Sequence, residues 1–388
     1  MMTQDTKENY DYIIAGMGAA GLSLAMRLKT SNIAFNKILL IDKDLKNKND
    51  RTWCFWTKDA DAWYYSIVYR KWSQFEFISQ DFRKVFELKP YSYFMIRGID
   101  FYSYCLKELK EDNRFDIRNA EILGLSSEHD LGVLQTKNSS YQAKYIFNSA
   151  FRHNLIKKND INYVQHFKGW VIETTDILFD VNLPVFMDFR TAQYQDCRFY
   201  YLIPLAPNRA LVEYTGFSPN ALPSEEYDKK LHHYLENMLN IKDYNIVERE
   251  YGEIPMMESD FVNPYGPQVI NIGTAGGSSK ASTGYTFYFI QKNTNYIIDK
   301  LEKNQQLVDF KRSKKFKLYD SVLLDVINKN SIPADKIFTS LFKNNNITDL
   351  LTFLNEESSI WKDLGMMNSV PLLAFIKSTI VKLKHLYD

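Results

Sequence analysis

The pattern of apolar and polar positions near the N-terminus predicts three elements in a row. Residues 12–16 form a short apolar run that ends at a glycine, which is typical of a buried strand. Residues 19–29 place apolar side chains at helical spacing, and residues 37–42 form a second apolar run that ends in an acid. We therefore expect a strand–helix–strand unit with parallel strands and a right-handed connection.

Alternating apolar and polar residues dominate the middle of the chain. They predict strands within 63–97, short strands over 115–149 and a further strand-rich region over 164–216. The amphipathic patterns of 99–111 and 224–241 predict helices. This order of elements indicates an α/β protein with a β-rich region.

The last third of the chain is mainly helical in its periodicity. A glycine cluster at 273–284 precedes an expected helix that runs to about residue 304. The helical pattern continues from 305 to the end, with breaks near Pro333 and Pro371. We expect a C-terminal helical region.

The three glycines Gly16, Gly18 and Gly21 occupy the G-x-G-x-x-G places of a dinucleotide fingerprint. The motif follows an expected strand and opens an expected helix, so the first glycine permits the turn, the second admits a pyrophosphate and the third allows close packing. The helix start at Ala19 and Ala20 offers free N–H groups to the phosphates. Asp42, at the end of the next strand and followed by Lys43, is placed to bind ribose hydroxyls and disfavours a ribose 2′-phosphate.

A second glycine cluster favours FAD over NAD. A glycine turn that leads into a late helix can cradle the flavin end, where N–H groups and the helix dipole stabilise negative charge on a reduced flavin. The expected cofactor-binding residues of this cluster are Gly273, Gly276, Gly277, Thr283, Gly284 and Tyr285.

Composition and charge narrow the class of partner. The 388 residues carry a formal net charge of +1, so nucleic acid is not an expected partner. The three cysteines show no metal-ligand spacing, which predicts neither a metal site nor a disulfide framework and suggests a reducing cytosol. No apolar run reaches the roughly 20 residues that span a bilayer. The 26 Phe, 26 Tyr and 6 Trp fit either aromatic cores or a cavity for a long hydrophobic ligand.

Glu213 is an acid inside a strand-like stretch, Leu211 to Gly216. If this carboxyl is buried, its pKa rises and it can act as a general acid. The alternative is a strand acid that faces solvent or joins a salt bridge.

Several motifs in this order make the chain resemble the lycopene β-cyclases of carotenoid-forming bacteria, within a superfamily of flavoproteins. Besides the fingerprint, the resemblance rests on the segments 49–56, 186–190, 198–205, 211–215, 252–256, 273–277 and 282–285.

The resemblance implies a redox-neutral cyclisation of the ψ end groups of lycopene to β-rings, giving γ-carotene and β-carotene. It implies FAD that is active in its reduced form, with NAD(P)H as reductant. It makes Glu213 the general acid and Asp188 a residue that orients Glu213 or joins a proton relay. Arg51 and Thr52 are expected to contact the cofactor or to shape its pocket, and Arg97 is expected either to contact FAD or to be a surface arginine. Trp53, Phe55 and Trp56 fit either a polyene channel or core packing.

The chain departs from this family in two places. Many relatives have a second acid directly after the position of Glu213, where this chain has Tyr214. The wider superfamily often has Gly-Asp at the second flavin motif, where this chain has Gly273 and Thr274, which argues against an oxygenase. A flavin-dependent isoprenoid reductase or hydroxylase, and a carotenoid-binding protein without turnover, remain alternatives.

The expected fold is a Rossmann-like FAD-binding domain (1–62, 97–160 and 262–304) with an inserted antiparallel β-sheet substrate domain (63–96 and 161–261) and a C-terminal helical region (305–388). Lycopene is almost insoluble in water, so we expect a cytoplasmic protein that is peripherally associated with a membrane. The cluster Lys311–Lys317 and the stretch 372–387 fit an anionic lipid surface, or else a solvated face and a core helix. The sequence leaves the oligomeric state open.

Overall fold

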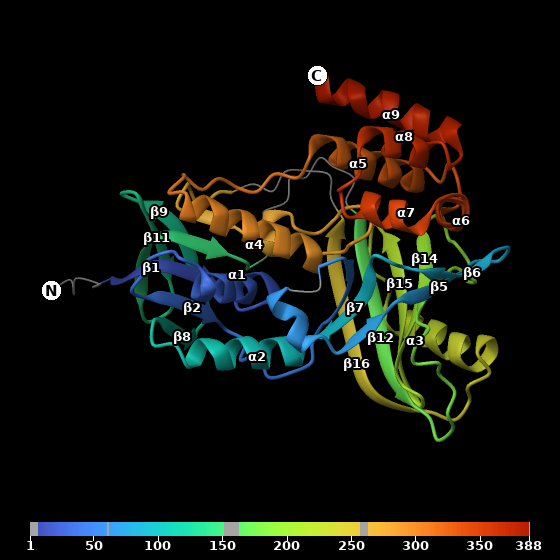
Figure 1. Cartoon of the computed structure of the whole chain (residues 1–388), viewed down its shortest axis with the longest axis horizontal. Helices are drawn as coiled ribbons and strands as arrows, with labels where there is room; N and C mark the ends of the chain where they lie inside the picture. Colours follow the sequence, from blue (N-terminus) through green and yellow to red (C-terminus); the bar gives the residue numbers. More distant parts are fainter. Residues whose placement is uncertain (1–6, 60–61, 151–162, 257–262, 388) are drawn as a thin grey trace.

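A computed structural model describes residues 7–59, 62–150, 163–256 and 263–387. A Rossmann-like sheet with helices and a second, mainly antiparallel sheet, in which the pair of β13 and β5 is parallel, lie side by side, and a layer of C-terminal helices covers part of both (Figure 1). The expected α/β class is confirmed, including the mainly helical C-terminal region.

The first sheet has the strand order β8-β2-β1-β11-β10-β9, with β17 paired to β11. The strands β8, β2, β1, β11 and β17 are parallel, whereas β10 and β9 run antiparallel. Side chains on both faces of β1 are buried: Ile14 packs towards the helices and Ile13 into a cluster on the opposite face. Double burial explains the continuous apolar runs of the sequence. The bounds are β1 Glu8–Ala15, β2 Ile38–Asp42, β8 Phe115–Asn119, β9 Gly124–Glu128, β10 Leu131–Gln135, β11 Ser140–Asn148 and β17 Val269–Asn271.

Helices α1 (Ala19–Thr30), α2 (Gly98–Lys110) and α4 (Phe287–Glu302) pack into one hydrophobic cluster with this sheet. The expected strand–helix–strand unit is therefore present as β1-α1-β2. The strand β17 and helix α4 come from more than 100 residues farther along the chain than β11 and α2. The unit is thus assembled from separated segments, as the sequence suggested.

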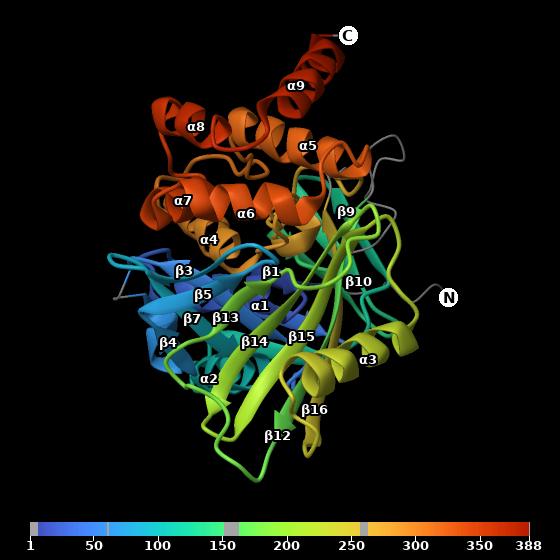
Figure 2. The same cartoon turned by 90° about the vertical axis from the view of Figure 1, so that its right-hand side faces the viewer.

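The second sheet has the strand order β16-β12-β15-β14-β13-β5-β6. Its strands alternate between two cores, since Leu211 packs on the face towards the C-terminal helices and Val212 on the face under α3 (Figure 2). Helix α3 (Ser224–His233) continues into a single π-helical turn at Tyr234–Met238. The bounds are β5 Gln74–Ile78, β6 Arg83–Glu87, β12 Tyr163–Glu173, β13 Val185–Asp188, β14 Cys197–Ala206, β15 Arg209–Ser218 and β16 Asn245–Met256.

A smaller sheet of order β3-β7-β4 joins the two units. Its strands are β3 Thr52–Thr57, β4 Arg70–Trp72 and β7 Ser92–Arg97, and a 3₁₀ turn covers Trp63–Ile67. The rings of Phe55 and Phe287 stack with centroids 4.7 Å apart, which ties β3 to α4. Most aromatic side chains of this region are core residues.

The C-terminal helices are α5 Lys314–Asn328, α6 Ala334–Asn344, α7 Ile347–Leu354, α8 Ile360–Met367 and α9 Leu372–Tyr387. The breaks near Pro333 and Pro371 are confirmed, because each proline directly precedes a helix. Phe342 of α6 stacks on Phe77 of the second sheet, with ring centroids 4.3 Å apart. The helices thus continue the hydrophobic core of that sheet.

The strands β3 and β16 were not predicted from the sequence. Strand β16 lies at the edge of its sheet and alternates exposed and half-buried residues, so charged side chains replace the usual apolar alternation. The expected domain boundaries remain a prediction, and those near residues 160 and 261 fall outside the described residues.

Four buried charges join the second glycine loop to the C-terminal helices. Lys280 Nζ lies 2.6 Å from Asp320 Oδ1 and 3.2 Å from Glu356 Oε1. Arg312 contacts the same two carboxylates. Because two cations balance two anions, none of these groups is buried without a partner.

We expect Lys280→Met to destabilise the protein by about 3 to 5 kcal/mol, since it leaves two buried carboxylates on one guanidinium. Thermal unfolding followed by circular dichroism measures the loss. The matched control is Lys336→Met, which breaks the exposed pair with Asp81 and should leave the unfolding temperature unchanged. Equal effects of the two substitutions would contradict a special role of the buried cluster.

Candidate active site

The first glycine loop leaves a groove at the start of α1. Gly16 has a φ of +103°, a conformation that other residues rarely adopt. A Cβ on Gly21 would lie 2.0 Å from the Gly16 oxygen, whereas a Cβ on Gly18 would meet nothing within 4 Å. The third glycine is therefore required by packing, and the second faces open space where a pyrophosphate can approach.

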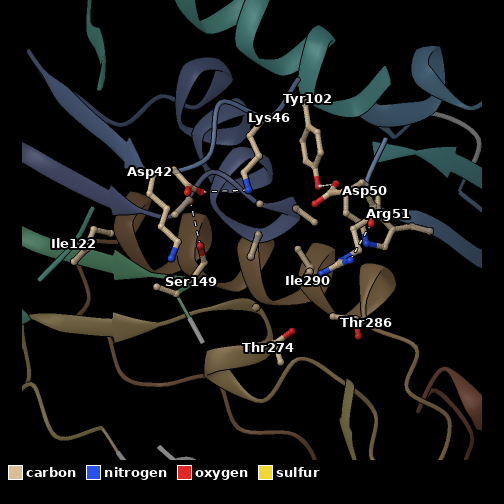
Figure 3. A pocket seen from close by; sticks show the side chains of 18 of the residues that line it. Asp42, Lys46, Asp50, Arg51, Tyr102, Ile122, Ser149, Thr274, Thr286 and Ile290 are labelled. Carbon is tan, nitrogen blue, oxygen red and sulfur yellow. Dashed lines mark hydrogen bonds and ion pairs between the residues drawn. The ribbon is translucent and has the colours of Figure 1, made fainter. Parts of the chain in front are cut away.

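The groove has a volume of about 610 Å³ and is lined by residues from both ends of the Rossmann-like unit. Asp42 lies at one end, where its Oδ2 accepts the Met17 N–H at 2.7 Å and lies 3.5 Å from Lys46 Nζ. Asp50 and Arg51 lie at the other end, beside Tyr102, whose hydroxyl donates to Asp50 (Figure 3). This arrangement fits a dinucleotide: N–H groups for phosphates, and a carboxylate for ribose hydroxyls.

The second glycine loop meets the first. Gly273 has a φ of +62°, and a Cβ there would lie 2.7 Å from the Cβ of Ala20. Thr274 and Thr286 line both this groove and a second pocket, as do Arg51, Trp53 and Ser149. The groove therefore continues into the second pocket, which we call the acid pocket.

The acid pocket has a volume of about 370 Å³ and contains Glu213. Apolar side chains form much of its wall: Phe167, Ile203, Leu211, Ile254, Pro255 and Phe287. The Glu213 side chain retains contact with solvent through the pocket, but protein surrounds it on its other sides. The pocket therefore combines apolar walls with polar groups that converge on it, which is typical of a small-molecule site.

A second acid, Glu250, lies beside Glu213. Strand register puts Glu213 of β15 opposite Gly169 of β12, and Gly169 opposite Glu250 of β16. Thr215 Oγ1 donates to Glu213 at 2.6 Å, and Thr52 Oγ1 donates to Glu250 at 2.8 Å. The two carboxyls also share a hydrogen bond across the glycine.

Burial, followed by the charge of Glu250, raises the pKa of Glu213 well above its usual range. Burial also raises the pKa of Glu250, against the lowering effect of hydrogen bonds from Thr52 and Glu213. Glu213 is thus the donor and Glu250 the acceptor in their shared hydrogen bond. The pair therefore holds a proton more tightly than a solvent-exposed glutamate does.

Neutral hydroxyl and thiol groups surround the pair. Burial raises the pKa of Tyr93, Tyr201 and Tyr285 well above the ordinary value for tyrosine. It also raises the pKa of the Cys54 thiol to about 12. These groups keep their protons at neutral pH, so they can donate hydrogen bonds without adding charge.

The expected cofactor-binding residues fall into three groups. Those that line the dinucleotide groove are Gly16, Gly18, Ala19, Ala20, Asp42, Lys43, Arg51 and Gly273. Those that line the acid pocket are Thr52, Thr283, Gly284 and Tyr285, besides Arg51. The residues found in neither lining are Gly21, Arg97, Gly276 and Gly277.

Arg97 and the late glycines have structural surroundings. The Arg97 guanidinium binds Asp100, with nitrogen–oxygen distances of 2.6 and 2.8 Å, and lies over the Tyr69 ring. A Cβ on Gly276 would lie 2.3 Å from the Asn271 oxygen, and Gly277 ends a 3₁₀ turn with a φ of +72°. These glycines shape the loop.

Asp188 is not brought together with Glu213. It lies opposite Tyr200 on β14, on the face of the sheet that packs under α3. Its buried carboxylate pairs with Arg190 at 2.6 Å and accepts the Tyr234 hydroxyl at 3.0 Å. Glu213 lies on the opposite face, because successive side chains of a strand alternate.

Sequence reasoning missed Glu250, Lys46, Tyr102, Ser149 and Gln165, which all line the groove or the acid pocket. Of the aromatic residues left open, Trp53 lines both cavities, whereas Phe55 and Trp56 are buried in the core. Among the described residues, no group of three or more His, Cys, Asp or Glu side chains is arranged to hold a metal ion.

Comparison with protein families gives one match over nearly the whole chain. A family model described as lycopene cyclase protein matches residues 11–379. A lycopene beta-cyclase from Pantoea ananas is 24% identical over 296 residues, which cover 72% of this chain and 71% of that protein.

Several solved structures share this fold. A geranylgeranyl bacteriochlorophyll reductase-like protein from Thermoplasma acidophilum has a TM-score of 0.66 at 13% identity, covering 96% of this chain and 99% of its own. A flavoprotein/dehydrogenase from Cytophaga hutchinsonii has a TM-score of 0.64 at 12% identity, covering 97% and 100%. These likenesses confirm the expected Rossmann-like flavoprotein fold.

We expect Gly21→Ala to weaken dinucleotide binding by about tenfold or more, the equivalent of about 1.4 kcal/mol, because its Cβ forces α1 away from the phosphate loop. The readout is the dinucleotide that copurifies with the protein and is released by heat. Gly365→Ala is the control, since a Cβ there meets nothing within 4 Å. Full retention of the dinucleotide by Gly21→Ala would contradict the assignment of the groove.

Proposed function

This chain belongs to the lycopene cyclase family, and we propose that it closes the linear ψ end groups of lycopene into β-rings, with reduced FAD as its cofactor. The observation that carries this proposal is Glu213, an acid whose pKa burial raises well above its usual range, in a pocket with apolar walls that opens onto a dinucleotide groove. An alkene is a very weak base. Its protonation requires an acid that keeps its proton at neutral pH and a site from which water is excluded.

FAD fits the two connected cavities. The groove along Gly16, Gly18 and Asp42 suits the adenosine and pyrophosphate, and Gly284 and Tyr285 lie where the cavity continues towards Glu213. The Gln165 side-chain oxygen is buried at this point without a hydrogen-bond partner, so it can accept the N–H of a flavin ring. Reduced FAD, when bound, supplies negative charge beside the reacting end group. We propose NAD(P)H as its reductant.

The chain's own residues supply the acid and the dry surface. Glu213 gives its proton to the terminal double bond of the end group, which creates a tertiary carbocation. With the end group bound, the apolar side chains of Phe167, Ile203 and Leu211 would take the place of water that could trap this cation. Tyr93, Tyr201 and Tyr285 line the same pocket as neutral groups, so they add no positive charge beside the cation.

We also propose that the substrate is delivered from a membrane surface. No helix within the described part of the chain is long and apolar enough to cross a bilayer. Helices α8 and α9 nevertheless lie at the outside of the molecule (Figures 1 and 2). Several of their large apolar side chains are exposed, and we call them together the apolar patch. It consists of Ile360, Trp361, Leu364, Leu372, Leu373, Ile376, Ile380 and Val381.

The apolar patch fits a lipid surface better than the basic cluster does. Trp361 is 80% exposed and Leu373 is 78% exposed, which is unusual for residues of this size. In the basic cluster, Arg312 and Lys315 bind Asp320, Glu356 and Asp363 inside the helical region. The side chains of residues 383–387, the end of the expected interfacial stretch, lie outside the described residues.

We expect purified protein with FAD to convert lycopene in liposomes to a ringed product of unchanged mass, under anaerobic conditions and after reduction with dithionite. Glu213→Gln should lower the rate by about 10²- to 10⁴-fold, because Gln cannot donate a proton to carbon. Chromatography with mass detection measures both.

Glu173→Gln is the matched control, since Glu173 is exposed at the end of β12. A product heavier by an oxygen atom would indicate a hydroxylase, and a product heavier by hydrogen atoms would indicate a reductase. Tight lycopene binding without conversion would indicate a carotenoid-binding protein.

We expect Trp361→Ser and Leu373→Ser each to reduce binding to vesicles of phosphatidylcholine and phosphatidylglycerol by about tenfold, since each removes a large apolar side chain from the interface. Cosedimentation with vesicles measures the bound fraction. Ile177→Ser, which changes an equally exposed residue on another part of the surface, is the control. A similar loss for the control would mean that the apolar patch is not the docking surface.

A further inference from the structure

Glu250 lies in the acid pocket, yet the mechanism above gives it no part. We propose that Glu250 is the base of the ring closure, the carboxylate that removes the proton whose loss creates the ring double bond. This inference rests on the proposed function, because it assigns the second proton transfer of that reaction. Strand register, a glycine between the two acids and the hydrogen bonds that each acid receives support this role.

Gly169 makes the contact between the acids possible. Glu213 and Glu250 lie two strands apart, about 10 Å between their backbones. With glycine on the strand between them, both side chains can lean across the gap. A Cβ on Gly169 would lie 3.0 Å from Glu250 Cγ and 3.0 Å from Leu211 Cδ1, so a side chain there would push Glu250 aside.

The hydrogen bonds give the two acids different roles. One oxygen of Glu213 accepts from Thr215, and one oxygen of Glu250 accepts from Thr52 on β3. Between the acids, Glu213 donates and Glu250 accepts. The pair therefore presents one proton donor and one proton acceptor to the same pocket, which both residues line.

The charged and titratable groups around the pair leave this assignment intact. The groups that face the pair from neighbouring elements are Cys54 on β3, Tyr93 on β7, Tyr201 on β14 and Tyr285 in the glycine loop. All four keep their protons because burial raises their pKa values. Three charged residues are also close. Arg51 lowers the pKa of Glu250 and Glu248 raises it, whereas Glu253 lies at the pocket wall.

Other acids near the site are placed less well for this step. Glu253 is exposed and accepts the hydroxyl of Tyr251. Asp188 lies on the opposite face of the sheet and is paired with Arg190. Glu250 is the acid that combines contact with Glu213 and access to the pocket.

The proton balance of the reaction closes within the pair. Glu213 gives its proton to one carbon of the terminal double bond. The other carbon of that double bond then carries the positive charge. The electron pair of a second double bond then forms the ring bond and moves the positive charge to a ring carbon. Glu250 takes a proton from the carbon beside this charge, and the C–H electron pair becomes the ring double bond. Transfer of that proton from Glu250 to Glu213 restores the starting state, with no atom or electron gained or lost.

The first test needs no substrate. Infrared difference spectra of the purified protein, recorded across about pH 5 to 9, follow the protonated carboxyl band that Glu213→Gln removes. In Glu250→Gln this band should disappear about one pH unit lower, because the negative charge that favours protonated Glu213 is absent. Glu173→Gln should leave the titration unchanged. An unchanged titration in Glu250→Gln would overturn the pair.

The second test uses the position of the ring double bond in the product to identify the base. A ring cation has several neighbouring C–H bonds, and the position of the base decides which proton leaves. Glu250→Gln should form rings about 100-fold more slowly and place part of their double bonds at other positions, detected by chromatography of products of equal mass. Gly169→Ala should produce the same mixture while both carboxylates remain.

The outcomes separate this inference from the proposed function. Pure β-rings formed by Glu250→Gln at the wild-type rate would overturn Glu250 as the base, with the cyclase intact. If the wild type forms no ring, the proposed function fails and the base assignment with it, whereas the infrared titration still decides whether the two carboxyls share a proton. Melting temperature and bound flavin show that each variant is folded.

Discussion

The hydrogen bond between two glutamates in one pocket governs the rest of the site. Burying a single carboxylate costs several kcal/mol unless it is paired, and two of them cannot both ionise at contact distance. Glu213 and Glu250 meet this constraint by keeping a proton between them. The surrounding residues support this pair. Gly169 permits the contact, Thr215 donates a hydrogen bond to Glu213 and Thr52 donates one to Glu250, and the neutral tyrosines add no charge.

The topology explains why this pair lies beside a dinucleotide groove. The chain leaves the Rossmann-like sheet at β17 and passes through the second glycine loop before it returns in α4. On the way the loop borders the antiparallel sheet, where a Cβ on Gly284 would collide with Gln165 of β12. A cofactor that follows the groove is thereby led to the sheet that carries the acids. Neither sheet forms this site alone.

Much of this was predictable from local patterns, and the failures have physical reasons. The fingerprint and the order of elements follow from spacing and alternation close in the sequence, whereas the local pattern around Glu213 left open whether its carboxyl is buried or faces solvent. Glu250 was missed because its strand is an edge strand with many charged residues. In addition, Glu250 lies close to Glu213 only because β16 and β15 both pair with β12, and the sequence does not show this pairing. The sequence suggested that Asp188 lies beside Glu213. Side chains alternate between the two faces of a sheet, however, and Asp188 lies on the face opposite to Glu213, where it pairs with Arg190. Sequence alone does not reveal which strands become neighbours.

The four buried charges around Lys280 also have a consequence for dynamics. Opening the glycine loop by itself would leave Asp320 and Glu356 with half of their cationic partners inside the protein. We therefore expect the loop and the C-terminal helices to open together and not separately. Exchange of a tightly held cofactor would then follow the slow opening of this whole unit, with hydrogen-exchange protection in the loop and in α5 rising and falling together.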